Sequence, residues 1–339
     1  MQVSEFDYPL PEERIAQYPL EDRAGSRMLV LHRRESRWED RMFRELPSFL
    51  RPGDCLVLND TKVFPARLLG HRKGFRGEVE VFLVRPIDAD GRTWQALVRP
   101  GRKMRSGERV VLGEGLESFI VGRNEFGERI VRLECEGDLY EKLDQIGHVP
   151  LPPYIRRKDE PKDRARYQTV YANQTGSVAA PTAGLHFTPE VLEACATAGA
   201  DVARLTLHVG LGTFQPLHTE VVEQAKLHSE FFCIREEQAA KMRRAQRLVA
   251  VGTTAVRTLE TAARGAGLVA AQGETDLFIH PGFEFQATGA MLTNFHLPRS
   301  SLLILVCALA GKELVLEAYR HAIDAEYRFY SYGDCMLIV

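Results

Sequence analysis

Four histidines occupy sequence contexts that suit acid–base chemistry, LHFT, LHVG, LHSE and FHLP, with the imidazoles at His186, His208, His228 and His296. A neutral imidazole exchanges a proton near pH 7, so general-base duty is a natural function for such a group. A single histidine is more often structural than catalytic, but four in or beside expected loops indicate a site. Their spacing matches no common zinc motif, and no HExxH pair or cysteine partner accompanies them, so we predict no metal.

A second candidate site is the sequence Gly252-Thr253-Thr254, between an expected strand and an expected helix. Two hydroxyls and the free N–H groups at a helix start make an anion site. Arg257, one turn later, would add a bidentate contact to a carboxylate or phosphate. The segment also fits an ordinary threonine N-cap, and it lacks the GK[ST] ending of a Walker loop. Three acids beside turn-like sequence each fit a cap or a base: Asp60, Glu230 and Asp334.

The stretch GSVAAPTAGLHFT, residues 176–188, is the element that would bring such groups together. Its centre, residues 179–184, has almost no side-chain volume and shows neither helical nor strand periodicity. Small residues let a backbone approach a ligand closely. Thr188-Pro189 is typical of a helix start. Taken alone, the stretch fits a tight connection between layers as well as a ligand-binding loop.

Alternating helices and strands after residue 176 predict an α/β layer with mostly parallel strands. The expected helices span 189–198, 236–247, 255–264, 302–310 and 312–327. The expected strands span 202–209, 248–251 and 277–279, with another strand at the end of the chain. In such sheets ligands bind beyond the carboxyl ends of strands. Three expected strand ends carry loops with little side-chain volume, GLGT (210–213), GTT (252–254) and HPG (280–282). Their convergence favours ligand binding over packing.

Short alternating runs with Gly, Pro, Asn or Asp between them begin at about Phe64, and they predict a small antiparallel barrel or sandwich. The proline-rich segment 148–155 would return the chain to the main domain. We therefore predict a discontinuous α/β catalytic domain, residues 1–63 and 151–339, interrupted by a β-barrel domain, residues 64–150.

The predicted barrel carries basic side chains, among them Arg67, Arg72, Lys73, Arg102 and Lys103. Most charge runs are simply solvated faces, but a basic rim on a small barrel also suits an RNA backbone. The chain of 339 residues has 44 Lys and Arg against 46 Asp and Glu, a net charge of -2. Any nucleic-acid surface must therefore be local.

The six cysteines form no CxxC pair, which favours free thiols in a reducing compartment. The first residues, MQVSEFDYPLPEER, include no apolar signal segment. The longest apolar run, 302–310, is far shorter than the ~20 residues that span a bilayer. We expect a cytoplasmic protein without a membrane partner. Neither a GxSxG elbow nor a GxGxxG fingerprint occurs, so a serine hydrolase or a Rossmann dinucleotide site is not indicated.

Nine motifs, in matching order over nearly the whole chain, resemble the S-adenosylmethionine:tRNA ribosyltransferase-isomerase family of queuosine biosynthesis. They are NDTKVFPARLLG (59–70), LPPYI (151–155), YQTVYA (167–172), GSVAAPTAGLHFT (176–188), TLHVGLGTFQP (206–216), HSE (228–230), AVGTTAVRTLE (250–260), TNFHLPRSSL (293–302) and YRFYSYGD (327–334). Thr261 and Cys335 stand where smaller residues are expected. The linker 156–166 and the barrel loops carry little of the pattern.

The resemblance implies a larger α/β domain interrupted by a small β-barrel, and an unusual reaction. S-adenosylmethionine is consumed as a substrate that gives up its ribosyl part, with no cofactor. The acceptor is the aminomethyl group of 7-aminomethyl-7-deazaguanine at the wobble position of tRNA. Adenine and methionine leave, and the tRNA then carries epoxyqueuosine. The resemblance also points to a monomer.

This reaction makes demands that can be matched to residues as hypotheses. A base must remove a proton next to the sulfonium; we take His186 and His208 as first candidates because both lie in glycine-rich loops, with Asp60 and Glu230 second. Thr253, Thr254 and Arg257 would hold the methionine carboxylate or a tRNA phosphate, and Phe187 or Phe214 would stack on a base. The other predicted substrate-binding residues are Thr182, Gly184, Gly210, Gly212, Thr213 and His296.

Two alternatives of other classes stay open. A non-catalytic RNA-binding protein that uses the barrel would explain the basic rim, but not a second domain with several ligand-type loops. The second alternative is a different nucleoside transferase or hydrolase on the same scaffold. Dependence of the activity on S-adenosylmethionine would distinguish the predicted enzyme from it.

Overall fold

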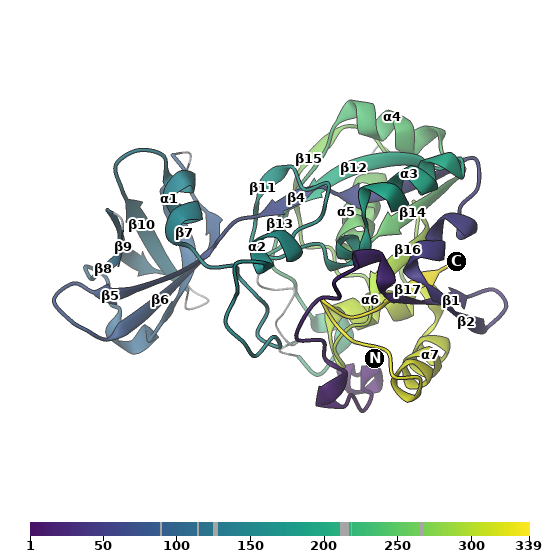
Figure 1. Cartoon of the computed structure of the whole chain (residues 1–339), viewed down its shortest axis with the longest axis horizontal. Helices are drawn as coiled ribbons and strands as arrows, with labels where there is room; N and C mark the ends of the chain where they lie inside the picture. The colour runs from purple at the N-terminus through teal and green to yellow at the C-terminus, as the bar shows by residue number, and fades with distance from the viewer. Residues whose placement is uncertain (89, 114, 125–127, 211–216, 218, 265–266) are drawn as a thin grey trace.

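The chain folds into a large layered domain and a small barrel joined by a narrow connection (Figure 1). The computed structural model describes residues 1–88, 90–113, 115–124, 128–210, 217, 219–264 and 267–339. Within these ranges no helix has the length and apolarity to cross a bilayer. The predictions for Gly212, Thr213 and Phe214 lie outside the described residues.

A nine-stranded mixed sheet forms the centre of the large domain, in the order β15-β13-β12-β3-β14-β16-β17-β1-β2. Its strands are β1 (Arg27–His32), β2 (Arg37–Met42), β3 (Asp54–Asn59), β12 (Asp201–Leu207), β13 (Glu230–Ile234), β14 (Arg247–Val251), β15 (Ala271–Thr275), β16 (Thr288–Asn294) and β17 (Cys335–Ile338). The four central strands β12, β3, β14 and β16 run parallel, and β1 runs parallel to β17. The remaining pairs are antiparallel. The predicted α/β domain with an inserted barrel is confirmed, with the parallel part confined mainly to the centre of the sheet.

Helices and turns cover both faces of this sheet, because its central strands are apolar on both sides. Along β3, Val57 joins the core under α5 (Thr253–Ala263), α6 (Ser301–Ala310) and α7 (Lys312–Asp324), whereas Leu56 and Leu58 join the core under α3 (Pro189–Thr197). The alternation follows the two-residue period of a strand. The helix α4 (Glu236–Arg244) lies near β12 (Figure 1).

The inserted barrel is closed by six strands in the order β10-β7-β6-β5-β8-β9. These are β5 (Arg67–Arg72), β6 (Glu78–Pro86), β7 (Thr93–Arg99), β8 (Arg109–Gly113), β9 (Leu116–Arg123) and β10 (Arg129–Glu134). Their inward side chains surround the fully buried Trp94. After β10, the helix α1 (Leu139–Ile146) packs on the same core through Leu139 and Leu143.

Two passages of the chain join the barrel to the large domain. The outgoing strand β4 (Thr61–Val63) pairs in parallel with β11 (Gln174–Ser177), and the returning segment includes the short helix α2 (Asp163–Arg166). The remaining elements are 3-10 turns: η1 (Val3–Phe6), η2 (Glu12–Arg14), η3 (Arg23–Gly25), η4 (Phe43–Phe49), η5 (Gly101–Lys103), η6 (Thr182–His186) and η8 (Val222–Gln224).

One element prediction was wrong. Residues 277–279 form no strand; the strand is β15, which ends at Thr275. The carbonyl oxygen of Leu277 accepts a hydrogen bond from Arg257 Nε at 3.0 Å, so this backbone is held by a side chain from α5 rather than by a neighbouring strand.

Candidate active site

A pocket opens beyond the carboxyl ends of β12, β14 and β16. Of the three predicted strand-end loops, residues 252–254 line it, residues 280–282 are not among its lining residues, and residues 211–213 lie outside the described part of the chain. The wall of the pocket includes Val209, residues 179–183, residues 252–254 and residues 293–297. Its empty space, with the open mouth included, is about 640 Å³. The carboxyl ends of parallel strands are where ligands bind in sheets of this kind.

The start of α5 forms one wall of the pocket. Gly252 adopts a left-handed φ of 88°, which turns the chain from β14 into the helix without a side chain in the way. Thr253 and Thr254 follow in the first helical turn and are 6% and 8% exposed. Thr254 Oγ1 is buried and has no hydrogen-bond partner among the described residues. A buried hydroxyl beside the free N–H groups of a helix start is suited to an anionic group of a ligand.

The end of β16 supplies the polar groups opposite. His296 lines the pocket, and its Nε2 lies 2.7 Å from Thr293 Oγ1. The backbone around this ring is fixed from both sides, since His296 N donates to Tyr319 Oη and its carbonyl accepts from Tyr8 Oη. Burial lowers the pKa of His296 to about 3, so its ring is neutral at pH 7.

His186 lies behind this wall rather than in it. Its Nε2 is 3.3 Å from Asn294 Oδ1, and Asn294 lines the pocket. Because Asn294 Nδ2 donates to the carbonyl of Tyr330, its Oδ1 faces His186 and requires a donor there. His186 is therefore protonated on Nε2, and its Nδ1 accepts from Ser26 Oγ at 2.8 Å. Burial lowers the pKa of His186 to about 4.

The small-residue loop approaches the pocket as expected, and Thr182 and Ala183 line it. The requirement for glycine at 184 has a different origin. A Cβ at Gly184 would lie 2.1 Å from Tyr171 Oη, so the glycine makes room for a buried tyrosine. Phe187 is fully buried and packs edge-on against Phe43 at 5.0 Å between ring centroids, so it lies in the core under the sheet rather than on the pocket wall.

His208 and Asp60 lie outside the lining residues, toward the connection to the barrel. His208 Nδ1 is 2.8 Å from Thr61 Oγ1, and its ring stacks on Phe231 at 5.5 Å. Burial lowers the pKa of His208. Asp60 accepts a hydrogen bond from Thr206 Oγ1 at 2.6 Å, and its burial raises the pKa of the carboxyl group.

Glu230 and Arg257 form a buried ion pair away from the pocket wall. The second carboxylate oxygen of Glu230 accepts the N–H of Gly210 at 2.7 Å. Arg257 also donates to the carbonyls of Leu277 and Thr275. The structure thus places these two predicted residues together, and beside Gly210, but not with Thr253 and Thr254 in the pocket.

Sequence reasoning missed an aromatic wall formed by Tyr154 and Tyr330. Their rings stack at 4.6 Å, and both line the pocket. Tyr154 Oη is 2.6 Å from Ser331 Oγ, and Tyr330 has a left-handed φ of 70°. The motifs LPPYI and YRFYSYGD contain both tyrosines. Nothing in either motif alone indicates that they meet, because 175 residues of chain separate them.

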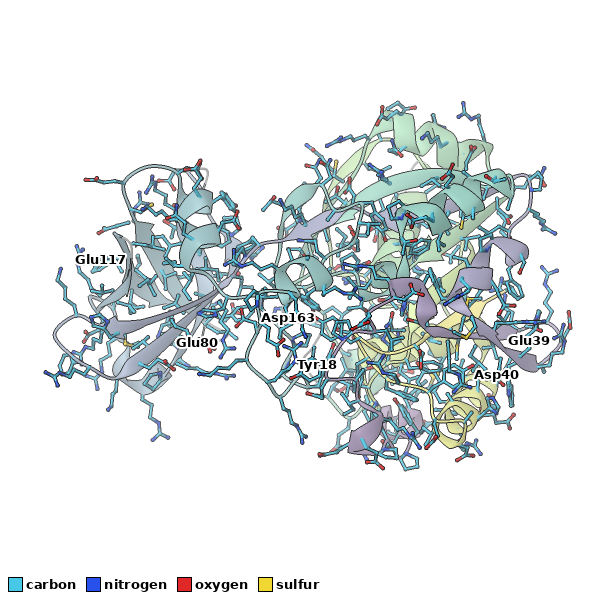
Figure 2. All side chains as sticks on the ribbon, viewed as in Figure 1. Tyr18, Glu39, Asp40, Glu80, Glu117 and Asp163 are labelled. Atoms are coloured by element: carbon cyan, nitrogen blue, oxygen red, sulfur yellow. The ribbon has the colours of Figure 1, made fainter. Side chains whose placement is uncertain are left out.

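The basic residues of the barrel divide into two groups. Arg67, Arg72 and Lys73 form ion pairs with Glu80, Glu108 and Glu117; Figure 2 labels Glu80 and Glu117 on the barrel. Arg102 and Lys103 are exposed in η5, and the described residues show no ion pair with either. Nor do the described side chains contain a group of three or more residues that would hold a metal ion.

Comparisons with known proteins agree with this architecture. The family model for queuosine biosynthesis protein matches residues 3–338. The chain is 66% identical to the S-adenosylmethionine:tRNA ribosyltransferase-isomerase of Solibacter usitatus and 51% identical to that of Symbiobacterium thermophilum, in each case over the full length of both chains. It is also similar to the crystal structure of S-adenosylmethionine tRNA ribosyltransferase from Thermotoga maritima, with a TM-score of 0.57, 42% identity, and coverage of 99% of this chain and 100% of the other. With its barrel inserted into a layered domain and its pocket at the ends of the central strands, the chain belongs to the queuosine biosynthesis protein family.

Proposed function

We propose that this protein transfers and isomerises the ribosyl part of S-adenosylmethionine onto the aminomethyl group of 7-aminomethyl-7-deazaguanine in the wobble position of tRNA. The products are adenine, methionine and tRNA that carries epoxyqueuosine. The observation that supports this best is the pocket itself: a helix start with an unpaired buried hydroxyl, the neutral imidazole of His296 and a stacked aromatic wall surround one space. Full-length identity of 66% to a relative with this activity in its name adds to the argument.

The methionine carboxylate is the anion that we assign to the start of α5. Thr254 Oγ1 and the N–H groups of the first turn would hold it, as a negative charge is favourable at a helix N-terminus. The aromatic wall of Tyr154 and Tyr330 lies in the same pocket and suits the adenine ring or the sulfonium, since cations and flat rings both pack on aromatic faces.

The buried histidines would orient groups rather than exchange protons. His186 and His296 both have a pKa well below 7, and both are held by hydrogen bonds. A neutral imidazole on Asn294 Oδ1 fixes the amide against Tyr330, and the oriented amide then faces the substrate. We assign His186 as a positioning residue that acts through Asn294. His186→Gln keeps an N–H donor, so it should retain much more turnover than His186→Ala, with the loss in kcat rather than in KM.

For the base beside the sulfonium we keep His208 and Asp60. His208 is half-buried, with Nδ1 fixed on Thr61, and it adjoins Val209 of the pocket wall. The carboxyl pKa of Asp60 is raised by burial, toward the range where a general base works well. Glu230 is held by Arg257 and Gly210, which suits a structural role. We also propose a cytoplasmic monomer that consumes S-adenosylmethionine without a cofactor or metal.

The first experiment is incubation of the protein with S-adenosylmethionine and tRNA that carries the deazaguanine precursor. Release of adenine and methionine that depends on the precursor, with a ribosyl-derived mass gain on the tRNA, is expected. Binding of tRNA without adenine release would favour the non-catalytic RNA-binding alternative. Adenine release with no mass gain on the tRNA would indicate a nucleoside hydrolase.

Thr254→Val tests the carboxylate site. Because the hydroxyl has no protein partner, its replacement should leave stability nearly unchanged while the KM for S-adenosylmethionine rises. The matched control is Thr258→Val on the same helix, whose hydroxyl bonds the carbonyl of Thr254 and does not line the pocket. An unchanged KM in Thr254→Val would remove this residue from the site.

A further inference from the structure

A second hollow lies directly behind the pocket, and we call it the arginine hollow because Arg23 and Arg166 border it. Ser331 lines both spaces. His186 lines the hollow, while its hydrogen-bond partner Asn294 lines the pocket. A single layer of side chains therefore separates the hollow from the place where the reaction would occur.

The arginines at this hollow are anchored on neutral acceptors. Arg23 donates to the carbonyls of Leu185 and Ala165. Arg166 donates to the carbonyls of Leu20 and Glu21, at 2.5 and 2.9 Å. Carbonyl oxygens orient a guanidinium without cancelling its charge, and each guanidinium has five N–H donors, so further donors remain.

A third guanidinium, that of Arg328, lies near the same hollow. It donates to the carbonyl of Tyr18, one residue before Pro19 of the hollow wall. Apart from burial, which is the main cause, the charges of Arg23 and Arg328 lower the pKa of His186. The positive charges of these arginines therefore act on the ring of His186, which lies between the two spaces. Among the described residues, the acid whose charge acts on Arg328 is Asp334, and its carboxylate accepts the backbone N–H groups of Arg27 and Arg328.

Two guanidinium donors here have no partner in the described part of the chain. They are Arg166 Nε and Arg328 Nη1, and both are buried. Buried polar atoms are almost always hydrogen-bonded, so an orphaned cationic donor indicates a missing acceptor. None of Arg23, Arg166 and Arg328 forms an ion pair with a described acid. Arg23 and Arg166 border the hollow, and each keeps N–H donors beyond those bound to carbonyls, so an anion in the hollow would find donors on both.

The surroundings suit RNA. Figure 2 labels Tyr18 and Asp163 on the side of the large domain that faces the barrel. Tyr18 is 47% exposed; the guanidinium of Arg157, which forms an ion pair with the buried Asp163, lies 4.2 Å from its ring centroid, and Lys162 Nζ lies 5.3 Å from it. An exposed aromatic ring among cations is a typical surface for single-stranded nucleotides, whose bases stack and whose phosphates pair with arginine.

We propose that the arginine hollow binds a phosphodiester group of the tRNA next to the nucleotide whose base enters the pocket. The inference rests on the proposed function and adds a location for the tRNA backbone on the large domain. A phosphate is favoured over the methionine carboxylate because two guanidiniums without a described ion-pair partner border the hollow, with a third, Arg328, nearby, and because the start of α5 already offers a site for one carboxylate. The barrel and the hollow would then hold the tRNA from two sides.

The test compares Arg166→Gln with Arg166→Lys and with the control Arg244→Gln, an exposed arginine on α4. The affinity for unmodified tRNA is measured at several salt concentrations, and the affinity for S-adenosylmethionine separately. Arg166→Gln should weaken tRNA binding about three- to tenfold and reduce the slope of log K against log salt by about 0.7, the value for one phosphate contact on a single strand. Arg166→Lys should keep most of the slope, and Arg244→Gln should match the wild type.

An unchanged affinity and slope in a folded Arg166→Gln would overturn the proposal. So would a weaker affinity for S-adenosylmethionine with tRNA binding intact, which would make the anion the methionine carboxylate. Thermal melting of each variant shows whether it is folded; if Arg166→Gln is not, Arg23→Gln gives the same comparison. These binding measurements need no turnover. Failure of the wild type to release adenine would contradict the proposed function, but it would not change the measured dependence of tRNA affinity on salt.

Discussion

Glu230 and Arg257 form an ion pair in which the side chains are 5% and 7% exposed, and the pair joins strand β13 to helix α5. The same carboxylate accepts the N–H of Gly210, and the same guanidinium donates to the carbonyls of Leu277 and Thr275. One charged contact therefore fixes the helix that carries Thr253 and Thr254 relative to the loop that follows β12. It is a positioning device for two walls of the pocket.

Glu230→Gln should destabilise the protein strongly. The substitution leaves Arg257 buried without its charge partner, and removal of one partner of a buried pair typically costs about 3–5 kcal/mol. Denaturant unfolding monitored by circular dichroism measures the free energy of unfolding. The matched control is Glu317→Gln on α7, where the carboxylate is exposed. A loss no larger than that of the control would show that the pair contributes little to stability.

Stability should fall when the pH is lowered from about 6.5 toward 4. The folded-state pKa of His186 is about 4 and that of His296 about 3, both below the ordinary value of 6.5. The unfolded chain therefore takes up protons first, so the stabilisation present above pH 6.5 is lost as the pH falls. For His186 alone, the free energy of unfolding lost in this way is about 3 kcal/mol.

Unfolding of His186→Gln between pH 7 and pH 4.5 measures this effect. The free energy of unfolding of the variant should depend less steeply on pH than that of the wild type, because the variant lacks one histidine whose pKa is lowered by folding. His71→Gln, at an exposed barrel position, should follow the wild-type curve. Parallel curves for His186→Gln and the wild type would mean that the ring is not held neutral by burial.

Gly184→Ala should destabilise the fold and disturb the pocket loop. The new Cβ would lie 2.1 Å from Tyr171 Oη, and overpacking of this kind costs about 1–3 kcal/mol. Tyr171→Phe should be nearly neutral by itself, because Tyr171 Oη is buried with no partner among the described residues. In the Tyr171→Phe background the cost of Gly184→Ala should shrink. Additive costs in this double-mutant cycle would show that the clash lies elsewhere.

The architecture was predictable from the sequence because its signals are local. Turn residues between short alternating runs marked the barrel, and Thr188-Pro189 marked the start of α3. Small residues marked two segments of the pocket wall, at 179–183 and 252–254, whereas the predicted loop at 280–282 does not line the pocket and residues 211–213 lie outside the described residues.

The side-chain arrangement of the site was harder to predict from the sequence, because it depends on contacts between segments that are far apart in the chain. Nothing local to His186 shows that Asn294 stands between it and the pocket. Arg257 follows Thr254 by one helical turn, yet it faces Glu230 and the carbonyls of Thr275 and Leu277. Gly184 was interpreted as a ligand-binding residue, but in the structure a side chain at this position would clash with Tyr171. The predicted roles of these residues therefore stay hypotheses for mutagenesis.

The barrel offers the last prediction, which concerns which of its basic residues contact tRNA. Lys73 lies 3.2 Å from Glu117, and Arg67 and Arg72 are also paired with acids, so their charges are largely compensated. Arg102 and Lys103 are exposed on η5 and, within the described ranges, pair with no acid. Uncompensated cations release more counterions on binding a phosphate backbone, so the double variant Arg102→Gln/Lys103→Gln should lower tRNA affinity and the salt slope more than Lys73→Gln does. Binding titrations at several salt concentrations measure both quantities. If the double variant and Lys73→Gln lower tRNA affinity equally, or if the double variant has no effect, the tRNA does not bind at η5. The tRNA would then contact another face of the barrel or the arginine hollow alone.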